Sequence, residues 1–173
     1  ERWFRSADSL EPVHILFFSL LYRPDVYLEF QMIALAQALE TYHRCKFEGK
    51  YQADEVYTQG LYQKLIAAIP PDLDSDFRQS LKQKLRYAND YSFRRRLKDL
   101  VSRWSDSSLP LAFLSSRDKR EQFVQQVADT RNFLVHHDPR LEDKAARGKH
   151  LSRLVREMTA LLEVALLEEL GFR

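Results

Sequence analysis

The segment TRNFLVHHDPRL, residues 130–141, combines side chains that could act on a phosphate ester. Histidine titrates near neutral pH and can move a proton to or from a ribose hydroxyl or a leaving oxygen. Arginine holds a phosphate with two parallel donors and stabilises negative charge in a transition state. Arg131 and His136 are therefore the candidate catalytic residues. Since the 2′-hydroxyl of RNA can serve as an internal nucleophile, such a pair would need no metal, and its products would carry a 2′,3′-cyclic phosphate and a 5′-hydroxyl.

The apolar residues of this region repeat at helical spacing, which predicts one helix over residues 117–136. Its core stripe is predicted to contain Val124, Val127, Ala128, Leu134 and Val135. Arg131 shares this stripe, so its guanidinium must be paired or must face a cavity. At about 100° per residue, Arg131 and His136 lie roughly 140° apart around the axis and about 7.5 Å apart along it. The two heads would meet only in a groove beside the helix end.

Simpler roles exist for the same residues. Arg131 could be a buried ion-pair partner, and His136 could be a terminal histidine that interacts with the helix dipole. His137 could do the same or contact RNA. Metal-ligating residue types also occur near the motif, but consecutive residues point away from each other and no His-x3-His pair exists. The sequence therefore predicts no metal site and no cofactor.

The composition is that of a globular domain, with 173 residues, 45% apolar and 30% charged. No apolar run is long enough to span a bilayer, so no membrane association is expected. Cys45 is the single cysteine and suits a reducing compartment, from which we expect a cytoplasmic location. The net charge of +2 does not by itself indicate a nucleic-acid binder. Local basic runs such as FRRRLK (93–98) are either solvated helix faces or an RNA track, which makes Arg94, Arg95 and Arg96 candidate RNA-binding residues.

Helical periods occupy almost the whole chain, so the predicted fold class is all-α, a helical bundle with a long C-terminal helix. A first helix is expected over residues 12–22, and a second begins at Pro24 and Asp25, where proline and negative charge suit a helix start. Further helices are expected over residues 53–69, 75–88 and 93–104. A last helix from about Leu151 ends at Gly171, a plausible C-terminal cap.

Two segments resemble a known superfamily. RNFLVH (131–136) matches the R-[polar]-x-x-x-H signature of HEPN domains, compact α-helical domains found in many RNA-cutting toxins and defence proteins. LEFQMIALAQALETYHR (28–44) resembles the matching helix of the ApeA-like HEPN group, a bacterial anti-phage family. The resemblance implies that Arg131 binds the scissile phosphate, that His136 is the general acid or base, and that Asn132 orients the pair. Some members add an acidic residue, for which Glu40 is the first candidate and Asp129 the second. Glu40 could equally form a structural ion pair with Arg131.

HEPN nucleases usually dimerise so that two motifs face each other, which implies a homodimer with a composite active site and RNA, possibly tRNA, as substrate. In the ApeA-like group the HEPN domain follows an unrelated N-terminal domain. Since the chain opens on Glu1 rather than Met, we expect residues 1–11 to be a linker from an N-terminal sensor domain, and residues 12–173 to be the HEPN-like domain. The resemblance thus predicts a metal-independent endoribonuclease in anti-phage defence or toxin-like abortive infection. The alternative is a non-catalytic HEPN-type module for dimerisation or RNA binding.

Overall fold

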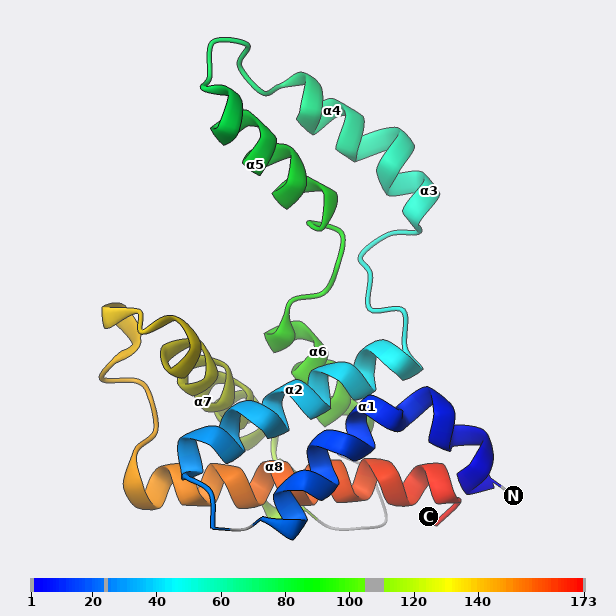
Figure 1. Cartoon of the computed structure of the whole chain (residues 1–173), viewed down its shortest axis with the longest axis vertical. Coiled ribbons are helices and arrows are strands. Elements are labelled where there is room, and N and C mark those ends of the chain that lie inside the picture. Colours follow the sequence, from blue (N-terminus) through cyan, green and yellow to red (C-terminus); the bar gives the residue numbers. More distant parts are fainter. Residues whose placement is uncertain (1, 24, 105–110, 173) are drawn as a thin grey trace. The chain divides into compact units, whose positions relative to one another are not determined.

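A computed structural model describes residues 2–23, 25–104 and 111–172, with side chains from Asp8 onward. Every element in these ranges is helical except for one isolated bridge between Lys50 and Asp90, which confirms the all-α prediction. The chain divides into two compact units (Figure 1). The larger unit contains the chain up to Phe47 and again from Phe93 onward, and the smaller unit contains residues 48–92. The sequence predicted one helical domain, and the division into two units differs from that prediction.

The larger unit is a bundle built around one central helix, α2 (Leu28–Lys46), which packs against α1, α6, α7 and α8. The bounds of these partners are Arg2–Tyr22 for α1, Phe93–Trp104 for α6, Arg117–His136 for α7 and Gly148–Leu170 for α8. Two short 3₁₀ turns, η2 (Ala112–Leu114) and η3 (Pro139–Leu141), flank α7. The long C-terminal helix predicted from the sequence is α8, and it ends with Gly171 in the left-handed conformation, as expected.

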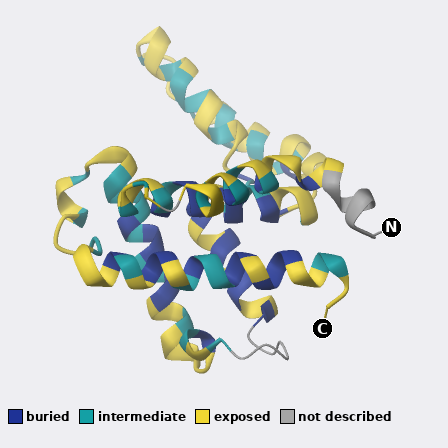
Figure 2. Cartoon of the chain, turned by 60° about the horizontal axis from the view of Figure 1, so that its bottom comes forward, coloured by how far each residue is buried: buried dark blue, intermediate teal, exposed yellow. Residues whose placement is uncertain are grey.

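The core of this unit lies between α2 and α8. On α2, Met32, Leu35, Leu39 and Tyr42 are at most 2% exposed, because steps of three and four bring them onto one face. The apolar stripe of α8 is also buried: Leu151, Leu154, Val155, Met158, Leu161, Leu162 and Ala165. Figure 2 shows buried and exposed residues alternating along α8 as the helix turns. Packing of these apolar faces holds the bundle together.

Helix α1 is longer than predicted. It runs from Arg2 to Tyr22 and passes through Pro12, at which the sequence analysis expected a helix to begin. A proline inside a helix removes one backbone hydrogen bond. Leu10, Val13 and Phe17 lie on one face and are buried in the core, and this burial offsets the loss. Residues 2–11 are therefore helical, and their role as a linker from another domain stays a prediction. Helix α2 begins at Leu28, a few residues after the predicted start.

The smaller unit is a pair of helical segments, α3 to α4 and α5, which lie side by side (Figure 1). The first segment contains α3 (Asp54–Val56), a π-helical turn η1 (Tyr57–Leu61) and α4 (Tyr62–Ala67), where the sequence predicted one regular helix. In α5 (Ser75–Arg86), Asp74 caps the start of the helix by accepting from the N–H groups of Asp76 and Phe77. The two ends of the unit meet, because the N–H of Tyr91 donates to the carbonyl of Gly49 at 2.7 Å.

Candidate functional site

Helix α7 carries the motif and has the bounds that the sequence predicted. Ser116 caps its start by accepting from the N–H of Lys119. Val124, Val127 and Ala128 are at most 3% exposed, so the predicted core stripe holds along the first turns. Val135 is an exception: it is 42% exposed, because the helix extends beyond the core at its C-terminal end. The motif therefore lies where α7 passes from the core to solvent.

Arg131 is half-buried and has no carboxylate partner among the described residues. Its Cζ lies 5.5 Å from the ring centroid of Phe93 on α6, within the range of a cation–π contact. One of its terminal nitrogens also donates to the Asn132 side-chain oxygen at 3.1 Å. An aromatic face and a neutral amide therefore hold the guanidinium in place. Its positive charge stays unneutralised and available to an anion.

Neither acidic candidate contacts Arg131. Glu40 pairs with Arg44 one turn along its own helix, at 3.0 Å, so the predicted alternative of a Glu40–Arg131 ion pair is not formed. Asp129 accepts from the amide of Gln125 at 2.6 Å. Both carboxylates are thus engaged within their own helices. A catalytic role for either one stays a proposal.

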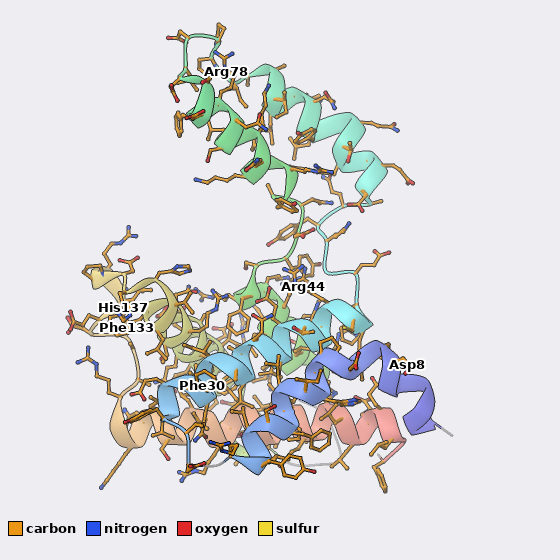
Figure 3. The ribbon with its side chains drawn as sticks, viewed as in Figure 1. Asp8, Phe30, Arg44, Arg78, Phe133 and His137 are labelled. Carbon is orange, nitrogen blue, oxygen red and sulfur yellow. The ribbon has the colours of Figure 1, made fainter. Side chains whose placement is uncertain are left out.

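The helix ends on an exposed histidine pair. His136 is the last residue of α7, and His137 adopts the left-handed conformation with φ 49° and ψ 39°. The N–H of His137 donates to the carbonyl of Phe133 at 2.7 Å, and its ring meets the Phe133 ring edge-on at 5.7 Å between centroids. Figure 3 shows Phe133 and His137 together at this end of α7. Glycine usually occupies such a cap, since a side chain is strained in this conformation.

An anion is fixed beside His136. The carboxylate of Asp138 accepts from the backbone N–H of Arg140 at 3.0 Å and from its guanidinium at 2.7 Å. These hydrogen bonds lower the pKa of Asp138 to about 2, and the nearby charge of His136 acts in the same direction. Asp138 is therefore ionised at neutral pH. A fixed negative charge therefore lies beside the motif histidine.

Thr130 and Phe93 support the motif, and neither was predicted from the sequence as part of the site. The Thr130 hydroxyl is fully buried and accepts from the N–H of Ala146 at 2.9 Å, which ties the connection after the motif back to α7. A threonine in an apolar stripe directly before the motif arginine was the available signal for Thr130. Phe93 had no such signal, because it lies in another helix far away in the sequence.

The three arginines proposed for RNA binding differ in exposure. Arg94 and Arg95 are exposed, whereas Arg96 is 1% exposed, so the RNA-contacting role predicted for Arg96 is wrong. The sequence treated 93–98 as one basic run, but helical geometry turns each residue by about 100° and directs Arg96 into the core.

Arg96 belongs to a buried polar network with His43 and Asp99. Its guanidinium lies 3.0 Å from His43 Nδ1, and His43 Nε2 lies 3.0 Å from an Asp99 oxygen. Since arginine can only donate, Nδ1 must accept and Nε2 must carry the proton, which makes His43 neutral. Burial lowers the pKa of His43, and the positive charge of Arg96 lowers it further, against the opposing hydrogen bond to Asp99. His43 is therefore a satisfied core histidine.

Residues 2–23, 25–104 and 111–172 show neither a cluster of metal ligands nor a helix suited to cross a membrane. No three histidine, cysteine, aspartate or glutamate side chains gather there in a way that could hold a metal ion. None of the helices in these ranges combines the length and the apolarity needed to cross a bilayer.

A comparison with protein families matches residues 33–173 to the family described as Apea-like HEPN. The match includes α2 from its second turn, all of α6 and α7, and α8 to the end of the chain. No curated protein and no solved structure matches the chain.

Proposed function

Because the chain belongs to the Apea-like HEPN family, we propose that its larger unit is a metal-independent endoribonuclease domain that acts on RNA, possibly tRNA, in anti-phage defence or toxin-like abortive infection. The observation that carries the proposal is the state of Arg131 at the exposed end of α7. Its guanidinium has a neutral aromatic and amide environment, no carboxylate of the described chain neutralises it, and His136 follows in solvent.

The proposed roles follow from these surroundings. Arg131 binds the scissile phosphate, and Asn132 fixes the guanidinium through its side-chain oxygen. His136 exchanges a proton with the ribose 2′-hydroxyl or the leaving 5′-oxygen. The 2′-oxygen attacks the phosphorus and the 5′-oxygen leaves with a proton, so the chain breaks into a 2′,3′-cyclic phosphate and a 5′-hydroxyl end.

A second copy of the chain fits this chemistry better than one copy alone. Arg131 faces α6, whereas His136 lies roughly 140° further around the α7 axis. No contact joins the two side chains in the described structure. We propose a homodimer in which the motifs of two chains form one composite site. The exposed Val135 beside His136 supplies apolar surface for such an interface.

The second candidate function is a non-catalytic module for dimerisation or RNA binding. The observation that favours it is the separation of Arg131 and His136 within one chain. In such a non-catalytic module, the contact between Arg131 and Phe93 only stabilises the packing of α6 on α7. A cytoplasmic location and an N-terminal sensor domain ahead of α1 remain part of the proposal for either function.

Product analysis tests the reaction. A tRNA pool is incubated with the chain in excess chelator, and the ends of the fragments are determined. We expect 2′,3′-cyclic phosphate and 5′-hydroxyl ends, and no cleavage of RNA that is 2′-O-methylated throughout, because the internal nucleophile is then blocked. Fragments with 3′-hydroxyl ends, or cleavage that needs added metal, would contradict the mechanism. Absence of cleavage by a dimeric chain would favour the non-catalytic module.

A further inference from the structure

A cavity of about 560 Å³ lies along the surface between α6 and α7, apart from the motif itself. Its lining is mostly basic and polar: Arg94, Lys98, Val101, Ser102, Arg117, Arg120, Glu121 and Val124. Four of these residues are cations and one is an anion. All of them belong to the larger unit. The cavity therefore offers concentrated positive charge on a chain whose overall charge is close to neutral.

The two cations from α6 are free to bind a ligand. Arg94 and Lys98 are exposed and lie one turn apart, and neither forms a hydrogen bond or ion pair with another described residue. On α7, Arg120 uses one nitrogen to donate to the carbonyl of Leu114 at 2.9 Å, and its remaining donors are not committed. Exposed cations without a hydrogen-bonded partner leave a positive field in the cavity, so an anionic ligand gains from that field.

The cavity leads toward Arg131. The start of α6 lies beside the last turns of α7, as the Arg131–Phe93 contact shows, while the end of α6 lines the cavity with the first turns of α7. The two helices are thus antiparallel. On α7, Arg131 falls within the same angular sector as Arg117, Arg120 and Val124, about 16 Å along the axis from Arg120. Arg94 lines the cavity and directly follows Phe93, the residue that contacts the motif arginine.

We propose that the groove between α6 and α7 binds the sugar–phosphate backbone of an RNA strand and directs it toward Arg131. This inference rests on the proposed function, since it assigns the scissile phosphate to Arg131. Arg94 and Lys98 contact phosphates from one wall, and Arg117 and Arg120 contact them from the other. The contacts are to the backbone and carry no base information, so the groove positions a strand without selecting its sequence.

Glu121 limits this binding. Its carboxylate lies 3.1 Å from Arg117 Nε. The hydrogen bond from Arg117 lowers the pKa of Glu121, and the charge of Lys98 across the groove adds to this effect. An ionised Glu121 repels phosphate and occupies Arg117. Replacing it should therefore strengthen RNA binding, an effect that a purely structural role of the groove would not produce.

The test measures equilibrium binding of a fluorescent single-stranded 2′-O-methyl RNA, which cannot be cleaved, at several salt concentrations. The groove variant is Arg94→Gln with Lys98→Gln. The matched control is Lys149→Gln with Arg156→Gln, which removes the same charge from exposed positions on α8 outside the groove. Glu121→Gln is the third variant. Circular dichroism and thermal unfolding check that each variant folds, which is expected for exposed substitutions.

We expect the groove variant to bind about 25-fold more weakly at about 0.1 M salt, since each lost phosphate contact costs roughly fivefold there, and to lower the salt slope by about 1.4. The control should change binding much less, and Glu121→Gln should bind several-fold more tightly. Equal losses in the groove and control variants, or no gain for Glu121→Gln, would overturn the proposal. Because no cleavage is measured, this result is independent of the nuclease test. If the groove variant loses RNA binding but the wild type does not cleave RNA, the proposed nuclease function is refuted and the RNA-binding groove is supported.

Discussion

His43 shows how a single buried residue links the fold to pH. It is fully buried, accepts from Arg96 and donates to Asp99, and can make both hydrogen bonds only when neutral. Burial acts to raise the pKa of Asp99, but hydrogen bonds from Arg103 and His43 outweigh it and hold that pKa below its ordinary value. Asp99 therefore stays ionised while His43 titrates.

We expect the free energy of unfolding to fall as pH drops below the ordinary histidine pKa of 6.5. The folded-state pKa of His43 is lowered, so the unfolded chain binds more protons in this range and acid favours unfolding. The measurement is urea unfolding at several pH values, for the wild type and for His43→Gln, which keeps one acceptor and one donor. The variant should show a weaker dependence on pH.

The contribution of His14 to the pH dependence cancels in this comparison. Burial lowers its pKa as well, but it is present in both proteins, so the difference between them reports on His43. His43→Ala, which leaves Arg96 without this acceptor, should lose about 3 kcal/mol at neutral pH. An identical pH dependence of wild type and His43→Gln would show that the network does not titrate.

Residue types and spacing at the motif could be predicted from the sequence, whereas the partners of those residues could not. The helical angle correctly placed Arg131 beside the core and excluded contact with His136 in one regular helix. The partner of Arg131 is Phe93, the first residue of the helix that the sequence predicted over residues 93–104. A choice between an aromatic ring and a carboxylate such as Glu40 depends on how α6 and α2 pack on α7, and no local pattern encodes this.

At the scale of elements, the bounds of α7 could be predicted from local sequence signals, whereas the start of α1 could not. Ser116 caps the start of α7, and the Asp138–Pro139 step stops it, so its predicted bounds agree with the structure. Pro12 gave an equally strong local signal for a helix start, but burial of Leu10 and Val13 outweighs it. Local propensity fails where tertiary packing is strong enough to oppose it.

At the end of α7, His137 is both a strained left-handed residue and a candidate RNA-binding residue. Substitutions at this position can separate the two properties. His137→Gly removes the side chain from a left-handed residue and should stabilise the chain by about 1 kcal/mol. His137→Ala is the matched control, because it also removes the ring that packs on Phe133 but keeps Cβ in the strained conformation. The midpoints of urea unfolding measure the difference between the two variants.

If Gly and Ala at position 137 give equal stabilities, the left-handed cap costs nothing and the strain argument fails. If the glycine variant is more stable but binds RNA more weakly than the wild type, the histidine is retained for its ring. That second result would support the RNA-binding role predicted for His137 from the sequence.

At the scale of the whole molecule, the core belongs to one unit. All the residues of the main hydrophobic cluster come from outside residues 48–92. The smaller unit is stabilised by its own contacts, including the hydrogen bond from the Tyr57 hydroxyl to the Leu85 carbonyl. The sequence predicted its helices, but a helical pattern does not show which helices share a core.

Removal of the smaller unit should therefore leave the larger one folded. Because Gly49 and Tyr91 are joined by a backbone hydrogen bond, a short Gly-Ser linker can replace residues 49–91. We expect a cooperative thermal transition and a helical circular dichroism spectrum from the shortened chain. A shortened chain without a cooperative transition would show that folding of the larger unit depends on the smaller unit.

The central claim is that Arg131 and His136 cut RNA, and one comparison tests it most directly. The initial rate of tRNA cleavage in excess chelator is measured for the wild type, Arg131→Ala, His136→Ala and the control His150→Ala, which removes another exposed histidine. We predict that the two motif variants remain folded and lose at least about 100-fold in rate, while the control keeps wild-type activity. Wild-type rates in both motif variants would contradict the claim.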